Sequence, residues 1–249
     1  MKSLAGKYIS ILGASTSTFD GISNNGAVNS TIVNNKPYYP KDFMTDVADT
    51  WWMRTIRALD LKLCVNNSWS GTCVTSKRFG PESAACMGRA MQLHNDQLNI
   101  EPDIIILIIG GNDSLRDYEV GPYNGAGDVF DASSNTYIGD DMLFGQAYAM
   151  MVHKVVSRYP NADVYVCSML HWPPRKSTKD LCKYNDVIRQ IADEFQITYV
   201  DLYNGTKIAP ETAAEYFHTD GVHPNKDGFA QMADRIINTI KENYKATAD

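Results

Sequence analysis

The sequence has few cysteines, no long apolar run and no block of basic residues. Its five cysteines are scattered and form no Cys-x-x-Cys pair, which indicates neither a zinc site nor a disulfide framework. No apolar run reaches the roughly 18 residues of a membrane-spanning helix, and the apolar run that ends at Gly13 is too short for a signal peptide. We therefore expect a cytoplasmic protein with reduced cysteines. A secreted protein whose signal had been removed would have the same sequence.

The charge balance is acidic. The 29 Asp and Glu residues outnumber the 23 Lys and Arg residues, so the formal net charge is −6. Without a basic cluster the chain has no footprint for nucleic-acid phosphates and no attraction to anionic membranes. The expected partner is a small-molecule or glycan substrate, with no nucleic acid and no membrane insertion. The oligomeric state leaves no signal in the sequence.

Length and composition describe an ordinary globular protein. The chain has 249 residues, of which 44% are hydrophobic and 21% charged, values typical of folded domains. A chain of this length buries roughly 70–75% of its unfolded surface and needs no disulfide or metal to support a core. Because neither a repeat nor a linker interrupts it, we expect a single domain over residues 1–249.

Short β-rich runs alternate with longer amphipathic stretches. The predicted strands are Tyr8–Leu12, Lys62–Asn66, Ile104–Ile109, Val164–Ser168 and Ile197–Val200. The third is apolar on both faces, as in a central parallel strand that helices cover on each side. The predicted helices are Phe43–Leu59, Leu181–Phe195 and a last one whose apolar residues recur at helical spacing from Phe229 to Ile240. This alternation predicts right-handed βαβ units and one doubly wound parallel sheet.

Two connections, Thr18–Asp42 and Asp113–Asp140, are longer than a compact domain usually has. Each follows a predicted strand, the first and the third. Both would therefore leave the carboxyl edge of the sheet, where open α/β sheets bind ligands. The two loops are expected to border the functional site; the alternative is that both are ordinary surface insertions.

Two motifs place polar groups directly after the first two strands. Gly13 permits a tight turn out of the first strand, and this turn would expose the Ser15 hydroxyl at the carboxyl edge. After the second strand, Gly71 would let the backbone approach a substrate and donate its N–H. Taken alone, either motif is more typical of an ordinary turn.

The other two motifs follow the central strand and precede the last helix. Gly110-Gly111-Asn112-Asp113 would point the Asn112 amide over the sheet edge, although turns also favour these residues. In Asp220-Gly221-Val222-His223-Pro224, the carboxylate can accept from the His223 ring and leave the second ring nitrogen to take a proton from a serine. Pro224 suits the first turn of the helix. The four motifs together contain the groups that acyl transfer requires.

On these residues the chain resembles the SGNH hydrolase superfamily, the GDSL-type esterases and lipases. The family's four blocks carry in order a Ser, a Gly, an Asn and an Asp-x-x-His, and they match Ser15, Gly71, Asn112 and Asp220 with His223. The resemblance spans nearly the whole chain. It implies a three-layer α/β/α sandwich around a flavodoxin-like, five-stranded parallel sheet, with no cofactor and no metal.

The chain departs from the family at one position. The family's Gly-Asp-Ser is Gly-Ala-Ser here, with Ala14 in the acidic position. Because that aspartate is not the acid of the triad, we expect the chemistry to survive. The change puts the hydrogen bonding of the nucleophile turn in doubt and leaves Ser17 as a second candidate nucleophile.

The predicted function is that of a serine esterase with a Ser-His-Asp triad. Ser15 would attack the ester carbonyl, His223 would carry the proton, and Asp220 would orient His223. The backbone N–H groups of Ser15 and Gly71, with the Asn112 side chain, would form the oxyanion hole.

The acyl group is expected to be small, acetyl first of all. No apolar lid helix suggests a channel for a fatty chain, and both long loops are polar. Trp69 and Trp172 are candidate walls on which a sugar could stack, so a carbohydrate ester is one expected substrate. The alternative for both tryptophans is packing that closes the sheet edge.

Two alternatives belong to other functional classes. A flavodoxin-like cofactor-binding module would use Gly13–Thr18 as a phosphate loop, but it leaves Gly110–Asp113 and Asp220–His223 unexplained. A non-catalytic glycan-binding homologue would keep the fold, with Ala14 as a sign of lost activity.

Overall fold

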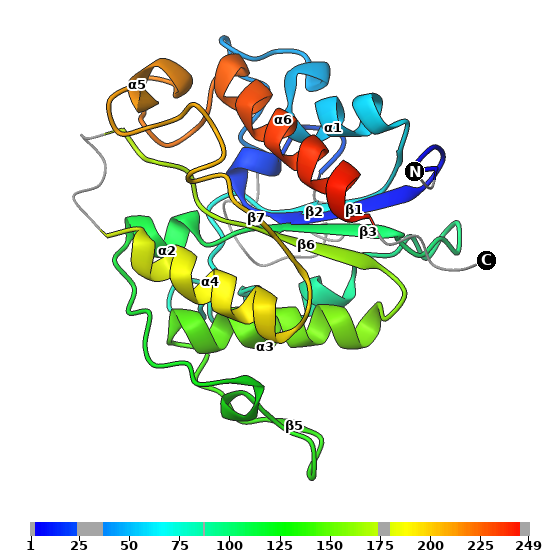
Figure 1. Cartoon of the computed structure of the whole chain (residues 1–249), viewed down its shortest axis with the longest axis vertical. Helices are drawn as coiled ribbons and strands as arrows, with labels where there is room; N and C mark the ends of the chain where they lie inside the picture. The colour runs from blue at the N-terminus through cyan, green and yellow to red at the C-terminus, as the bar shows by residue number, and fades with distance from the viewer. Residues whose placement is uncertain (1–2, 24–36, 87, 174–179, 245–249) are drawn as a thin grey trace.

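The computed structural model describes residues 3–23, 37–86, 88–173 and 180–244. Five parallel strands form one sheet in the order β2-β1-β3-β6-β7 (Figure 1). They are β1 (Tyr8–Gly13), β2 (Lys62–Ser68), β3 (Ile104–Ile108), β6 (Asp163–Cys167) and β7 (Thr198–Val200). All five predicted strands are present, with ends that shift by one or two residues. The order is that of flavodoxin-like sheets.

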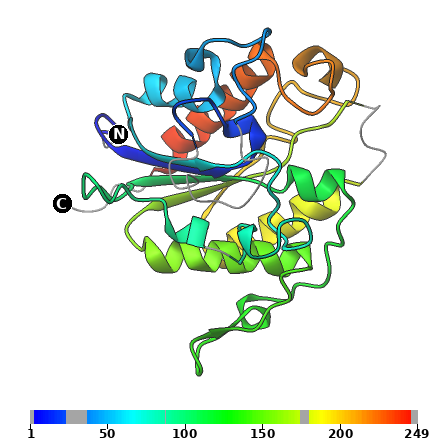
Figure 2. The same ribbon diagram turned by 180° about the vertical axis from the view of Figure 1, so that it is seen from behind.

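Helices cover both faces of the sheet and complete three layers (Figures 1 and 2). One face carries α1 (Trp51–Leu59) and α6 (Lys226–Asn243), and the other carries α3 (Phe144–Arg158) and α4 (Cys182–Glu194). The predicted α/β/α sandwich is confirmed. None of these helices, nor any other in the described part of the chain, has the length and apolar character that crossing a membrane requires.

The central strand is apolar throughout because both of its faces are buried. Ile104, Ile106 and Ile108 pack into the core on the α1 and α6 side. Ile105 and Leu107 pack into the core on the α3 and α4 side. Side chains alternate across a strand, so a strand with helices on both faces needs an apolar residue at every position.

The predicted helix Phe43–Leu59 was wrong in its first half. The α-helix begins only at Trp51, because the Thr50 side chain caps it by accepting the Met53 N–H at 3.3 Å. A separate 3₁₀ turn precedes the cap. The predicted helix Leu181–Phe195 is present as α4, one residue shorter at each end.

The N-terminus of the last helix also differs from the prediction. Asn225 caps α6 by accepting the N–H groups of Asp227 and Gly228, each at 3.0 Å. Pro224 therefore lies before the cap and not in the first turn. The sequence pattern did not indicate α3, because ten of its fifteen residues are buried and no single apolar stripe stands out.

The structure describes only part of the first long connection, whereas it describes all of the second. Within Thr18–Asp42, residues 24–36 lie outside the described part of the chain. Asp113–Asp140 starts inside the short helix α2 (Gly111–Leu115). It also contains a two-stranded hairpin that projects from the body on the α3 side (Figures 1 and 2). The hairpin strands are β4 (Phe130–Asp131) and β5 (Thr136–Tyr137). The second connection is therefore not one structureless loop. Elsewhere in the chain, the short helix α5 (Ala213–Tyr216) lies between β7 and α6.

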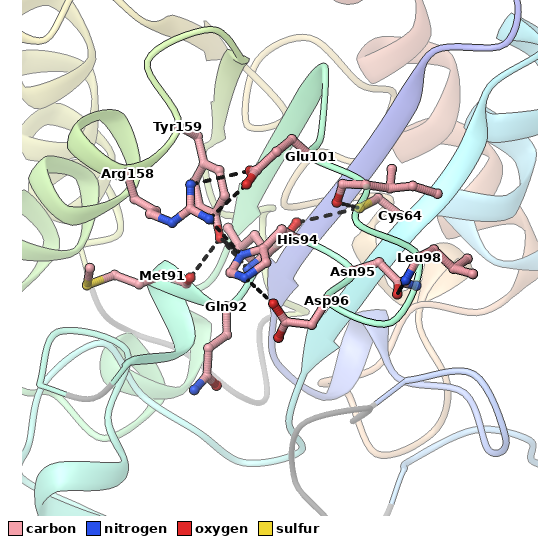
Figure 3. A network of polar contacts seen from close by, with 12 residues as sticks. Cys64, Met91, Gln92, His94, Asn95, Asp96, Leu98, Glu101, Arg158 and Tyr159 are labelled. Atoms are coloured by element: carbon pink, nitrogen blue, oxygen red, sulfur yellow. Dashed lines mark hydrogen bonds and ion pairs between the residues drawn. The ribbon is translucent and has the colours of Figure 1, made fainter.

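A polar network closes the amino edge of the sheet (Figure 3). The Tyr159 hydroxyl accepts the Leu93 N–H at 2.6 Å and donates to the Met91 carbonyl at 2.8 Å. Beside it, Arg158 pairs with Glu101 at 2.8 Å. Arg158 ends α3 and Glu101 precedes β3, so these contacts tie together the segments that lead into the strands.

Candidate active site

Ser15 follows the end of β1 and begins a single 3₁₀ turn. The turn packs so closely on β1 that a Cβ on Gly13 would lie 2.7 Å from Ser17 Oγ and 2.9 Å from Ser68 Oγ. Only glycine fits at such a distance. The turn leaves Ser15 at the carboxyl edge, where its Oγ lies 2.8 Å from Nε2 of His223.

Asp220 and His223 lie on the loop before α6. Gly221 occupies the left-handed region at φ 67°, which lets the loop fold back on itself. Asp220 Oδ1 accepts the N–H groups of Val222 and His223 at 2.8 and 3.0 Å. Asp220 Oδ2 lies 2.7 Å from His223 Nδ1. Ser15, His223 and Asp220 thus form a continuous line of hydrogen bonds.

The surroundings of Asp220 and His223 determine their protonation states. Burial raises the pKa of Asp220, but the hydrogen bonds that it accepts from Tyr38 and from the N–H groups of His223 and Val222 outweigh burial and hold that pKa well below its usual range. Burial lowers the pKa of His223 below its ordinary value, against the opposing effect of Asp220. His223 is therefore neutral at pH 7. Because a carboxylate only accepts hydrogen bonds, Nδ1 carries the proton and Nε2 accepts from the Ser15 hydroxyl.

Tyr38 contacts both Asp220 and His223, and no motif in the sequence pointed to it. Its hydroxyl donates to Asp220 Oδ2 at 2.6 Å. Its ring stacks on the His223 imidazole, with centroids 3.4 Å apart and planes 10° apart. The only signal in the sequence was the long loop after the first strand, which contains Tyr38.

The Gly71 motif forms the loop after β2. Gly71 has φ 76°, in the left-handed region that favours glycine. Its carbonyl oxygen accepts from Arg78 Nη1 at 2.9 Å. Within the described residues, no acceptor takes the backbone N–H of Gly71 or that of Ser15. Two backbone donors are therefore available at this end of the sheet.

Asn112 and Asp113 tie the Gly71 loop to α2. Asn112 Nδ2 donates to the Thr72 carbonyl at 2.9 Å, and an amide nitrogen has a second N–H to offer. Asp113 is fully buried, and it accepts from the Val74 N–H at 3.0 Å, the Thr75 N–H at 3.1 Å and the Thr75 hydroxyl at 2.8 Å. Burial raises the pKa of Asp113 to about 6. The second and third motifs thus form one unit.

A cavity of about 70 Å³ lies beside Ser15 and Asn112, which belong to its lining. Most of its wall is apolar and includes Ile108, Leu115, Met169, Leu170, Phe217 and Met232. Within the described residues, no group of three His, Cys, Asp or Glu side chains is placed to hold a metal ion. The cavity suits an uncharged, apolar group next to the serine.

The two candidate sugar-stacking tryptophans occupy different places. Trp172 lines the cavity, and its ring lies so near α2 that a Cβ on Gly111 would be 3.3 Å away. Trp69 is only 2% exposed, and its ring faces the buried Arg89 guanidinium at 4.7 Å. A buried ring cannot stack on a sugar, so the structure brings Trp172 but not Trp69 to the cavity.

The remaining residues of the first motif also have clear positions. Ser17 is fully buried, and its Oγ accepts from Trp51 Nε1 at 3.3 Å. It is Ser15, and not Ser17, that contacts His223. Ala14 lines the cavity, so the residue that departs from the family pattern contributes a methyl group to the cavity wall.

Comparison with known proteins identifies the family. The model of the GDSL-like lipase/acylhydrolase family matches residues 7–240. The GDSL esterase/lipase CPRD49 of Arabidopsis thaliana is 24% identical over 170 residues, which cover 66% of this chain and 64% of that protein, less than two thirds of its length.

Solved structures share the fold. The structure of a GDSL-like lipase from Bacteroides ovatus has a TM-score of 0.66 and 24% identity, covering 96% of this chain and all of that one. A family 3 carbohydrate esterase from Clostridium thermocellum has a TM-score of 0.57 and 16% identity, covering 95% of this chain and 96% of that one. The family match spans nearly the whole sequence, and the chain therefore belongs to the GDSL-like lipase/acylhydrolase family.

Proposed function

We propose that this protein is a serine esterase in which Ser15 is the nucleophile, His223 the general base and Asp220 the residue that orients His223. One observation carries the proposal. Ser15 Oγ lies 2.8 Å from His223 Nε2, and His223 Nδ1 lies 2.7 Å from Asp220 Oδ2. This is the arrangement of nucleophile, base and orienting acid that activates a serine hydroxyl.

In the first half-reaction, Ser15 Oγ bonds to the ester carbonyl carbon while His223 Nε2 takes the hydroxyl proton. The carbonyl oxygen becomes an oxyanion, which the N–H groups of Ser15 and Gly71 and the Nδ2 of Asn112 stabilise. The bond to the alcohol oxygen then breaks, and that oxygen takes the proton from His223. The products are a free alcohol and an acyl group on Ser15.

The second half-reaction repeats these steps with water. His223 takes a proton from the water, whose oxygen bonds to the acyl carbon. The bond to Ser15 Oγ then breaks, and the serine oxygen regains its proton from His223. The acid is released and the enzyme returns to its starting state.

The substrate in this proposal is an ester of a small acyl group, with acetyl preferred and carbohydrate as a carrier. The cavity of about 70 Å³ is roughly five to seven times the 10–15 Å³ that a single water molecule needs. That space suits a short acyl group better than a fatty chain. Trp172 in the wall and the carbohydrate esterase among the structural neighbours support a sugar ester.

The test is covalent labelling with a small organophosphonate, followed by intact-mass measurement and peptide mapping. We expect a single adduct on Ser15 and complete loss of p-nitrophenyl acetate turnover, with neither adduct nor turnover in Ser15→Ala. The buried Ser17→Ala variant is the matched control for hydroxyl loss in the same turn. An adduct on Ser17 would move the nucleophile, and folded wild-type protein with neither adduct nor turnover would support a binding role instead.

The acyl preference has its own test. We expect kcat/KM to fall from p-nitrophenyl acetate to butyrate to octanoate, because the cavity is short. Higher activity on octanoate than on acetate would contradict the small-acyl part of the proposal and leave the triad intact.

A further inference from the structure

The aromatic residue Tyr38 joins two side chains of the proposed triad. Its hydroxyl donates to the same Asp220 oxygen, Oδ2, that accepts from His223 Nδ1, at 2.6 and 2.7 Å. The other oxygen accepts two backbone N–H groups. Four donors therefore surround the carboxylate, which leaves it no freedom to rotate without losing hydrogen bonds.

The Tyr38 ring restrains His223 as well. It stacks on the imidazole with centroids 3.4 Å apart and planes 10° apart. Tyr39 packs edge-on against the same imidazole, with centroids 6.3 Å apart and planes 85° apart. An imidazole with one face against a parallel ring cannot tilt toward that side, so its Nε2 stays aimed at Ser15.

The backbone of the same segment is tied to the nucleophile turn. Tyr38 N–H donates to Thr18 Oγ1 at 2.8 Å, and the Thr18 hydroxyl donates to the Ser15 carbonyl at 2.8 Å. On the other side, the Tyr39 hydroxyl donates to the Pro224 carbonyl at 2.9 Å. Tyr38 and Tyr39 therefore connect the Ser15 turn to the His223 loop.

Ser15 and His223 form a hydrogen bond although they are 208 positions apart in the sequence, so their relative position depends on contacts between distant segments. Catalytic groups must stay within a fraction of an ångström of their working geometry. We infer that Tyr38 is a positioning residue for the reaction of the proposed triad. Tyr38 holds the His223 ring and the Asp220 carboxylate in the orientation in which His223 contacts Ser15. The inference rests on the proposed function. Tyr38 acts through His223 and Asp220 and not on the ester.

A pH profile can report on this role, because activity requires neutral His223. Removing the Tyr38 hydroxyl leaves more of the Asp220 charge to act on the Nδ1–H of His223, which raises the pKa of His223. Since activity is lost as His223 gains a proton, the acid limb of kcat/KM moves to higher pH. Among the described residues, the titratable or charged side chains around His223 are Asp220, His218, Lys41, Tyr38 and Tyr39, and of these only Tyr38 changes in the variants.

The experiment compares Tyr38→Phe, which keeps the ring, with Tyr38→Leu, which removes both ring and hydroxyl. Tyr137→Phe, on the projecting hairpin, is the matched control. For Tyr38→Leu we expect kcat on p-nitrophenyl acetate to fall by about 10²-fold, the loss that a 1 Å misplacement can cause, with KM nearly unchanged. Tyr38→Phe should recover most of that loss and show the upward shift of the acid limb.

Thermal melting and the stoichiometry of organophosphonate labelling identify any variant that has not folded, and Tyr38→Phe keeps the test decisive if Tyr38→Leu fails to fold. If both variants match Tyr137→Phe in kcat and pH profile while wild type is labelled on Ser15, the inference is wrong and the proposed function stands. If folded wild type takes no label and has no turnover, the proposed function fails, and the inference with it.

Discussion

At the scale of single residues, the site depends on a few backbone and side-chain positions with strict geometric demands. Gly13 leaves no room for a Cβ, and Gly71 has a left-handed φ of 76°. These two glycines place Ser15 and a free backbone N–H at the same sheet edge. Asn112 adds a side-chain donor, since only one of its two amide N–H groups is used by the Thr72 carbonyl.

The proposed oxyanion role of Asn112 predicts a loss of turnover when its side chain is removed. Asn112→Ala should lower kcat on p-nitrophenyl acetate by about 10²–10³-fold, or about 2.7–4 kcal/mol, because one oxyanion donor is lost. Steady-state kinetics give the effect on kcat and KM separately. The exposed Asn243→Ala at the end of α6 serves as the control, and unchanged turnover in Asn112→Ala would remove Asn112 from the proposed oxyanion hole.

At the level of elements, the candidate active site is built from loops that are hydrogen-bonded to one another. Asp113, at the start of α2, accepts three hydrogen bonds from Val74 and Thr75 in the loop after β2. Thr18 and Tyr38 connect the Ser15 turn to the first long loop. The proposed oxyanion donors and the nucleophile therefore depend on contacts between neighbouring connections and not only on their own strands.

Replacing Asp113 by Asn tests the contact between α2 and the Gly71 loop. The new Nδ2 group would donate where the carboxylate accepted, leaving a buried N–H without an acceptor, so the free energy of unfolding should fall by about 1–3 kcal/mol. Turnover should fall too, because the Gly71 loop is no longer fixed. Urea unfolding and kinetics measure the two effects, with exposed Asp186→Asn on α4 as the control. Wild-type values for both would show that the loop does not need Asp113.

At the scale of the whole molecule, the two edges of the sheet have different roles. Ser15, Gly71 and Asn112 follow the carboxyl ends of β1, β2 and β3, where ligands bind in open α/β sheets. The amino edge carries instead the network around Tyr159, which joins Leu93, Met91 and the end of α3 (Figure 3). From this separation we predict that a substitution at the amino edge changes stability without changing catalysis.

Tyr159→Phe tests that separation. The variant leaves the buried Leu93 N–H without its acceptor, so the free energy of unfolding should fall by about 1–3 kcal/mol. The kcat/KM on p-nitrophenyl acetate should stay at the wild-type value, because the network lies at the edge opposite Ser15. Chemical denaturation measures the free energy of unfolding, and kinetics on the same preparation measure kcat/KM. A large drop in kcat/KM of the folded variant would mean that the two edges are coupled.

The fold class and the order of the motifs could be predicted from the sequence, because hydrophobic period and chain order can be recognised without tertiary contacts. The fully apolar run Ile104–Ile109 and the motifs around Ser15 and His223 were readable without coordinates. The start of α1 at Trp51 was not, because Phe43 and Val47 continue the apolar spacing past the cap at Thr50.

Which side chains come into contact could be seen only in the folded chain. Tyr38 reaches Asp220 across 182 positions of sequence, and Trp69 is buried against Arg89 instead of facing the cavity. Such contacts depend on how strands and loops pack together, and the residue types alone carry no signal for them. The motifs indicated the groups proposed for catalysis, whereas the contacts that hold those groups in position arise from packing.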